Sequence, residues 1–284
     1  MNMNYNEILK NGENILKKNK IKNYILDTEL ILSKSINKKR EEILLNTNTK
    51  LKNKELLKFK NYLSRRRQKE PIAYILGYKH FWKYKFLTNK SVLIPRPDTE
   101  LIIEEALRHI PNDMSKKILD IGTGSGCIII SLLKDRQKCK ATALDISIKA
   151  INVAKTNAKL HQLENKINFI NIDIDKYKSY NYDLIVSNPP YINSIDLNRL
   201  DDDIKFHEPK IALSGGSDGF RDIKKVIIKS KELLKINGKL IIEIGYKQKN
   251  LSTKILTENG FYINKIAKDL SGKDRCIVST KLKK

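Results

Sequence analysis

The amino-acid sequence predicts an α/β fold with a mostly parallel sheet, preceded by a small helical domain. In residues 4–70, apolar residues recur at helical spacing. Further along, short apolar runs alternate with helical patterns, which is the order expected of a parallel sheet. Two of these runs, 118–121 and 184–187, end in turns of unusual composition. Open α/β sheets bind ligands at the carboxyl ends of their strands, so these two turns are the first candidates for a site.

The N-terminal segment is expected to form four or five short amphipathic helices. Its apolar residues come in helically spaced groups, for example Ile8, Leu9, Ile15 and Leu16, and then Ile25, Leu26, Leu30 and Ile31. On the pattern alone, such helices could simply form a cap on the sheet.

A β-hairpin is expected between the helices and the sheet. Residues 78–94 place Phe81, Tyr84, Phe86 and Val92 around a turn at 88–90. A helix over 98–109 follows, and then the strands and helices of the sheet. The last two strands, 261–267 and 276–280, are expected to close the sheet as an antiparallel pair.

Three parts follow from this order. We predict a helical domain over residues 1–72, a linker with the hairpin over 73–97, and the sheet domain over 98–284. A chain of 284 residues is long enough for one large and one small domain.

A glycine-rich turn follows the strand at 118–121 and opens an apolar helix at Cys127. A dinucleotide site has the spacing G-x-G-x-x-G, whereas here the glycines give G-x-G-x-G. This spacing fits S-adenosylmethionine, which needs close backbone approach and carries no pyrophosphate. We therefore predict a cofactor loop made of Gly122, Thr123, Gly124, Ser125 and Gly126. The alternative is a turn that serves only helix–strand packing.

Acidic residues end the next two expected strands. Asp145 ends the strand 140–145, about twenty residues past the glycines, where a carboxylate can accept both ribose hydroxyls. Alternatively it caps the helix 148–160, for which Ser147 is an equally good candidate. Asp173 follows the strand 167–172 and could receive the adenine amino group.

The most informative motif is Asn188–Pro189–Pro190–Tyr191, directly after the apolar run 184–187. Two prolines cannot sit in a central strand, so the strand ends here with a rigid, extended backbone. The Asn188 side-chain oxygen and the Pro189 carbonyl can accept the two hydrogen bonds of a planar NH2 group, while Tyr191 packs on its plane. The alternative is a stiff loop in which Tyr191 only packs. Asn188 is also expected to touch the cofactor.

The composition is strongly basic, with 56 Lys and Arg against 32 Asp and Glu and a formal charge of +24. Such a charge suggests nucleic acid as a partner. However, the basic residues are spread along the whole chain, as AT-rich coding would produce. No basic stripe is interleaved with aromatic residues.

The three cysteines and four histidines are scattered, which predicts no metal site and no disulfide framework. The N-terminus lacks an apolar signal core, and no run approaches the ~20 apolar residues of a membrane span. We expect a cytoplasmic protein that does not contact a membrane.

Together these motifs resemble the HemK/PrmC family, the methyltransferases that use S-adenosylmethionine to modify the glutamine of the Gly-Gly-Gln motif in peptide chain release factors. The resemblance covers nearly the whole length. Besides the glycine turn and Asn188–Tyr191, the matching segments are residues 70–77, 92–101, 208–209, 213–219 and 269–275.

The resemblance implies a Rossmann-like, mostly parallel, seven-stranded sheet and S-adenosylhomocysteine as the second product. It implies class I release factors as partners and a helical domain that recognises the factor. Proximity to the ribosome is compatible with the basic charge, and we expect a monomer. Arg96 and Glu208 are expected to shape the pocket. The family often has an aromatic residue after the adenine-contacting Asp, and this chain has Ile174, so plain apolar contact would replace stacking.

Neighbouring families share part of the pattern. Methyltransferases of exocyclic amines in DNA or RNA use similar Asn/Asp-Pro-Pro-aromatic motifs. A closer relative methylates a ribosomal-protein glutamine and resembles Pro-Arg-Ser-Pro where this chain has Pro95-Arg96-Pro97-Asp98. That difference favours the release-factor enzyme over these alternatives.

Overall fold

The computed structural model describes residues 3–283 and divides them into two compact units. The helical unit holds the chain up to Tyr78 together with Asp201–His207, and the sheet unit holds Lys79–Leu200 and the chain from Glu208 onward.

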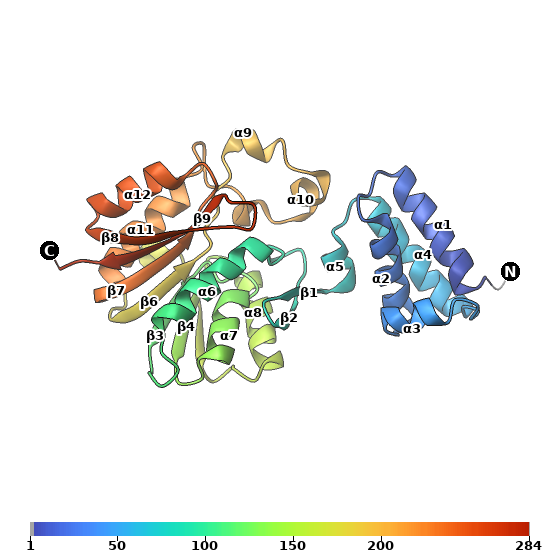
Figure 1. The fold of residues 1–284 in the computed structure, drawn as a ribbon, viewed down its shortest axis with the longest axis horizontal. Helices are drawn as coiled ribbons and strands as arrows, with labels where there is room; N and C mark the ends of the chain where they lie inside the picture. The colour runs from blue at the N-terminus through green and yellow to red at the C-terminus, as the bar shows by residue number, and fades with distance from the viewer. Residues whose placement is uncertain (1–2, 284) are drawn as a thin grey trace. The chain divides into compact units, whose positions relative to one another are not determined.

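The helical unit is built from six helices among the residues described (Figure 1). They are α1 Tyr5–Lys18, α2 Tyr24–Ile36, α3 Arg40–Leu45, α4 Asn53–Arg67, α5 Ile72–Leu76 and α10 Asp202–His207. The capping box of Asn4 and Glu7 starts α1. Gly12 lets α1 approach its neighbours, because a Cβ there would lie 2.6 Å from Thr28 Cγ2 and 3.0 Å from the Phe59 ring.

Helix α10 comes from a part of the chain that the sequence assigned to the sheet domain. A buried arginine holds it in the helical unit. The Arg66 guanidinium donates to Asp27 Oδ2 and to Asp203 Oδ2, each at 2.7 Å. No sequence motif predicts this ion-pair network, because each of its three residues is ordinary in its local sequence.

The hairpin is present, as β1 Tyr78–Phe81 and β2 Tyr84–Leu87, but its predicted turn at 88–90 is wrong. The chain turns at Trp82, whose φ is +53°. The Trp82 Nε1 and Tyr84 hydroxyl groups both donate to the Asp135 carboxylate at 3.0 Å, which fixes the turn by a tertiary contact.

The sheet unit contains the predicted seven-stranded, mostly parallel sheet, which confirms the α/β fold. The order across it is β5-β4-β3-β6-β7-β9-β8, in which only β9 runs antiparallel to its neighbours. The strands are β3 Lys117–Ile121, β4 Lys140–Asp145, β5 Ile167–Asn171, β6 Tyr182–Ser187, β7 Leu234–Glu243, β8 Phe261–Lys268 and β9 Asp274–Lys281.

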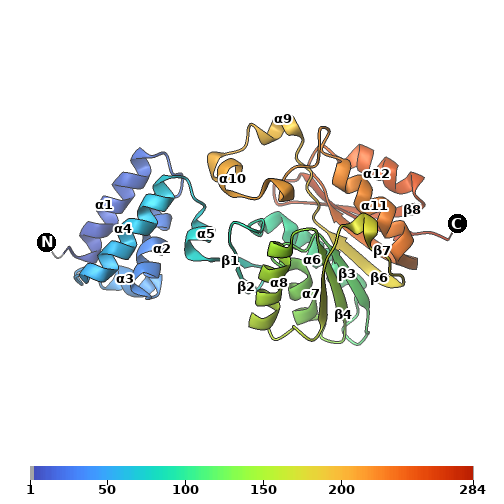
Figure 2. The same ribbon diagram turned by 180° about the vertical axis from the view of Figure 1, so that it is seen from behind.

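Two buried clusters cover the faces of this sheet (Figures 1 and 2). Side chains of α6 Glu100–His109, α7 Cys127–Asp135 and α8 Ile148–Leu160 pack on one face. Those of α11 Arg221–Leu233 and α12 Lys249–Glu258 pack on the other. Neighbouring residues of one strand belong to opposite clusters, for example Ile118 and Leu119, so the strands are apolar on both sides.

Short elements connect these layers. They are the 3-10 turns η1 Pro97–Thr99, η2 Ile174–Lys176 and η3 Lys210–Ala212, and the helix α9 Ser194–Leu197. Within residues 3–283, no helix has the length and apolar character that a membrane crossing needs.

The strand order reverses direction at β3, which lies between β4 and β6. In register, Ile121 at the end of β3 pairs with Ser187 at the end of β6. The glycine turn and the Asn-Pro-Pro-Tyr motif therefore leave the sheet side by side, at the switch point where α/β sheets bind ligands.

Candidate active site

A cavity of about 460 Å³ lies at this edge of the sheet unit. Its volume is in the range typical of small-molecule sites. Eight of the residues predicted from the sequence line it: Gly122, Gly124, Asp145, Asp173, Ile174, Asn188, Pro189 and Pro190. Thr123, Ser125, Gly126, Tyr191, Arg96 and Glu208 lie outside the lining.

The three glycines of the turn divide into two kinds. Gly122 and Gly124 have φ of +75° and +56°, and a Cβ on either would meet no atom within 4 Å, so the backbone faces open space. Gly126 instead serves packing, since a Cβ there would lie 2.9 Å from Ile130 Cδ1 and 3.3 Å from Ala154 Cβ. The predicted close backbone approach is thus geometrically open at the first two positions only.

Beneath the turn lies a buried carboxyl group, Asp120. Its Oδ2 accepts a hydrogen bond of 2.7 Å from the Thr123 hydroxyl, so this hydroxyl is already engaged by Asp120. Its Oδ1 has no hydrogen-bond partner among the described residues. Burial raises the pKa of Asp120 to about 7.

The Asp145 carboxylate is oriented by two backbone donors. Gly124 N–H donates to Oδ2 and Ser147 N–H to Oδ1, each at 2.9 Å. Each oxygen keeps a second lone pair for a ligand hydroxyl. Ser147, not Asp145, caps α8, because its hydroxyl accepts from Ala150 N–H at 3.3 Å. This arrangement leaves Asp145 available for a diol.

Asp173 has local partners that the sequence did not reveal. Its Oδ1 accepts from Asp175 N–H at 3.0 Å and lies 3.9 Å from Lys225 Nζ, which pairs more closely with Asp175 at 2.6 Å. Lys225, Arg221 and Asp222 of α11 also line the cavity. Sequence reasoning missed these three, because charged residues on an amphipathic helix usually mark only its solvated face.

The side chain of Asn188 is oriented by a hydrogen bond to Thr99. The Asn188 Nδ2 donates to Thr99 Oγ1 at 2.9 Å, so the amide oxygen is the end left for a ligand. Just before it, the Ser187 hydroxyl donates to the Ile121 carbonyl at 2.8 Å and joins β6 to β3. Across residues 3–283, no hydrogen bond is made to the Pro189 carbonyl. Both predicted acceptors, the Asn188 side-chain oxygen and the Pro189 carbonyl, therefore belong to residues that line the cavity.

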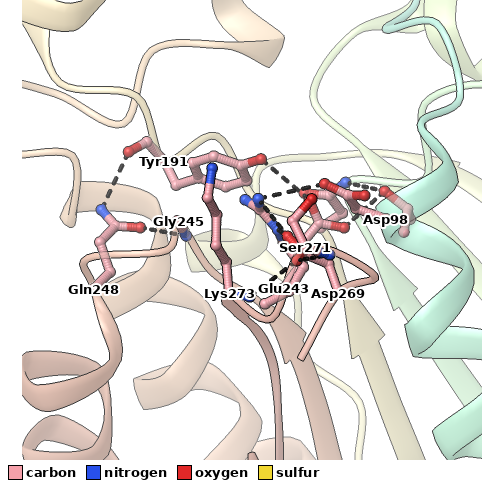
Figure 3. A network of polar contacts seen from close by, with 11 residues as sticks. Asp98, Tyr191, Glu243, Gly245, Gln248, Asp269, Ser271 and Lys273 are labelled. Atoms are coloured by element: carbon pink, nitrogen blue, oxygen red, sulfur yellow. Dashed lines mark hydrogen bonds and ion pairs between the residues drawn. The ribbon is translucent and has the colours of Figure 1, made fainter. Parts of the chain in front are cut away.

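Tyr191 occupies a different place from the one expected. It is absent from the cavity lining, and its hydroxyl donates to Glu243 Oε1 at 3.2 Å (Figure 3). The Gln248 amide donates to the Tyr191 carbonyl at 3.1 Å and so fixes its backbone. Burial and the nearby Glu243 carboxylate raise the pKa of Tyr191, which stays protonated. Stacking of its ring on a substrate amide stays a prediction.

Arg96 and Glu208 lie outside the cavity lining and form an ion pair with each other. The Arg96 guanidinium donates to Glu208 Oε1 at 2.5 Å, and the Ile94 N–H donates to Glu208 Oε2 at 3.1 Å. Glu208 is buried, so this pair fixes the segment that contributes Val92 and Leu93 to the lining. A pocket-shaping role is consistent with this indirect position.

No group of three or more His, Cys, Asp or Glu side chains within residues 3–283 is arranged to hold a metal ion. Cys127, Cys139 and Cys276 are free and buried.

Two family models match the chain: PrmC N-terminal domain over residues 7–77 and Methyltransferase small domain over residues 99–201. A solved methyltransferase from Pyrococcus furiosus shares the fold, with a TM-score of 0.52 and 18% identity over 70% of this chain and 89% of its own.

A Clostridium botulinum protein named Release factor glutamine methyltransferase is 38% identical over 97% of this chain and 98% of its own length. A Rickettsia felis protein named Bifunctional methyltransferase is 35% identical over 98% of this chain. The chain spans only 51–58% of the length of three such Rickettsia relatives. Since its similarity to the Clostridium protein runs through nearly all of both chains, this chain belongs to the HemK/PrmC family of methyltransferases.

Proposed function

We propose that this protein transfers a methyl group from S-adenosylmethionine to the side-chain amide nitrogen, N5, of the glutamine in the Gly-Gly-Gln motif of peptide chain release factors. The observation that carries the proposal is the orientation of Asn188. Its NH2 is taken by Thr99, and its oxygen is left as an acceptor at the cavity. An acceptor pair of this kind suits a primary amide, which offers two N–H donors.

Residues that line the cavity support the proposed cofactor. Gly122 and Gly124 allow backbone approach to the methionine part, and Asp145 offers acceptors for the two ribose hydroxyls. Asp173 keeps Oδ2 for the adenine amino group, with Ile174 as an apolar contact. S-adenosylhomocysteine is the product that leaves this site.

The residues act by orientation. When bound, the cofactor supplies a methyl group on a sulfonium, which is already activated. The Asn188 oxygen and the Pro189 carbonyl accept hydrogen bonds from the two N–H groups of the glutamine amide. These bonds hold the amide nitrogen toward that methyl group. The nitrogen gains the methyl and releases one proton to water, so no strong base is needed. Orientation of this type can supply up to ~7–11 kcal/mol of a bimolecular barrier.

The partner is proposed to be a class I release factor, recognised by the helical unit and methylated in the cytoplasm. The match of residues 7–77 to the PrmC N-terminal domain supports a distinct role for that unit.

The test is transfer of radiolabelled methyl from S-adenosylmethionine to three acceptors. They are a purified release factor, the same factor with its Gly-Gly-Gln glutamine changed to alanine, and total RNA. We expect label on the intact factor alone, with the methyl located on that glutamine by mass spectrometry of the peptide. Label on RNA with none on the factor would overturn the proposal.

A further inference from the structure

Behind Asn188 runs a chain of hydrogen bonds that ends in a buried acid. Asn188 Nδ2 donates to Thr99 Oγ1 at 2.9 Å, and the Thr99 hydroxyl donates to Glu243 Oε2 at 2.7 Å. The other carboxylate oxygen accepts from the Tyr191 hydroxyl at 3.2 Å (Figure 3). Thr99 and Glu243 are 3% and 1% exposed, so water does not compete for these bonds. Both ends of the motif thus connect to one carboxylate.

The donor and acceptor of each of these hydrogen bonds follow from the number of protons available. A carboxylate can only accept, so the single hydroxyl proton of Thr99 is committed to Glu243. Thr99 can then only accept from Asn188, which must present its NH2 to Thr99 and its oxygen to the other side. If the amide were rotated by half a turn, two acceptors would face each other. In a buried site an unmade bond of this kind costs about 1–3 kcal/mol.

We infer that Glu243, acting through Thr99, is the positioning residue that turns the acceptor oxygen of Asn188 toward the substrate amide. The inference rests on the proposed function, in which that oxygen accepts an N–H of the glutamine. Nothing in the motif itself selects this orientation, since an asparagine amide is nearly symmetrical in shape.

The charged and titratable groups around Glu243 come from four other segments. Asp98 lies on η1, Tyr191 follows β6, Arg275 and Cys276 lie on β9, and Cys127 lies on α7. Arg275 bonds Asp98 at 3.3 Å and Asp269 at 3.0 Å, and its charge favours the ionised form of Glu243, as do the Thr99 and Tyr191 hydroxyls. Burial outweighs these groups and raises the pKa of Glu243 to about 7.

Protonation of Glu243 would remove the requirement that Thr99 donates to Glu243 and accepts from Asn188. A protonated carboxyl can donate to Thr99, whose own proton is then free to turn toward Asn188. The amide oxygen would then face Thr99, and the acceptor at the cavity would be lost. We therefore expect kcat for methyl transfer to fall as the pH drops below about 7.

The first test compares two substitutions of Thr99. Thr99→Val keeps the shape and removes the hydroxyl, whereas Thr99→Ser keeps the hydroxyl. For Thr99→Val we expect kcat on the release factor to fall about tenfold or more, which corresponds to about 1.4 kcal/mol, with an unchanged dissociation constant for S-adenosylmethionine. Thr99→Ser should retain kcat within about twofold. Equal losses for both would overturn the inference, because they would point to packing of the methyl group.

The second test uses the pH profile, which a merely structural role would not move. Glu243→Gln should abolish the acid limb of kcat near pH 7, because an amide does not titrate there. Its control is Glu105→Gln, another buried acid of the sheet unit, which pairs with Arg108 and Lys265 instead of Thr99. That control should keep the wild-type acid limb.

The outcomes separate the two proposals. A wild-type protein that leaves the factor unlabelled would overturn the proposed function and this inference with it. A wild-type protein that labels the factor, with Thr99→Val and Glu243→Gln unchanged in both kcat and pH profile, would overturn the inference alone.

Discussion

Arg66 and Asp203 form a 2.7 Å ion pair across 137 positions of the sequence, inside the helical unit. The same guanidinium bonds Asp27 at 2.7 Å, and the side chain of Arg66 is only 8% exposed. Burial is the largest influence on Asp27 and raises its pKa, against the lowering effect of Arg66. The arginine thus compensates two acids that would otherwise repel each other.

Removing this arginine should destabilise the helical unit. Arg66→Ala leaves Asp27 as an uncompensated buried charge, and we expect a loss of about 3–5 kcal/mol in the free energy of unfolding. Arg67→Ala, one residue further on an exposed side of α4, is the matched control and should cost less than about 0.5 kcal/mol. Denaturant unfolding of the full chain measures both. Similar losses for the two variants would contradict the role of the buried triad.

The acceptor role of Asn188 predicts sensitivity to a single-atom change. Asn188→Asp would place a second carboxylate on Thr99, which has one proton for the two of them. We expect about a 100-fold loss of kcat, since misplacement of a reacting group costs that much. Asn152→Asp on the exposed side of α8 is the control and should keep wild-type activity. Wild-type methyl transfer by Asn188→Asp would remove Asn188 from the proposed mechanism.

The glycine turn allows backbone strain and ligand contact to be separated. Gly124→Ala adds a methyl group at φ +56° into open space, where we place the cofactor. Gly272→Ala adds one at φ +76°, also with no atom within 4 Å, between β8 and β9. Both should lose about 1 kcal/mol of stability. Only Gly124→Ala should weaken binding of S-adenosylmethionine in calorimetry, by about tenfold or more. Equal affinities would place the cofactor elsewhere.

The buried carboxyl of Asp120 predicts a pH dependence of stability. Its folded pKa of about 7 lies above its ordinary value of 3.8, so the stability it contributes is full below about pH 4 and is lost as the pH rises through about 7. Asp120→Asn does not titrate and should be more stable than wild type above pH 7, by about 2–4 kcal/mol.

The measurement is the free energy of unfolding of both proteins across this pH range. Asp113→Asn, on the exposed loop before β3, is the control for the substitution itself. Parallel curves for wild type and Asp120→Asn would show that Asp120 does not titrate near neutral pH.

Local patterns predicted the parts of the fold that local interactions determine. The strand 140–145 and the helix 148–160 were placed at their observed bounds, because the apolar runs and the Ser147 cap carry their own signals. The hairpin turn was misplaced because Asn89 offered a turn signal, whereas the real turn depends on Asp135, more than fifty residues away. A short stretch of sequence does not reveal tertiary contacts of this kind.

The same limit applies to the candidate site. The glycine turn and Asn188–Pro190 could be placed, since backbone requirements restrict their residue types. Glu243 could not, because an acid at the end of a strand looks like many others. The role that we infer for Glu243 depends on its hydrogen bonds to Thr99 and Tyr191, and the three residues lie in separate parts of the chain.

The discontinuity of the helical unit has a consequence for synthesis on the ribosome. Residues 5–76 emerge early, but Asp203 is translated more than 120 residues later than α5. Until then, Arg66 can compensate only Asp27. The helical unit therefore completes its ion pairs after the first four strands of the sheet have been made, and the order of translation delays the last step of its folding.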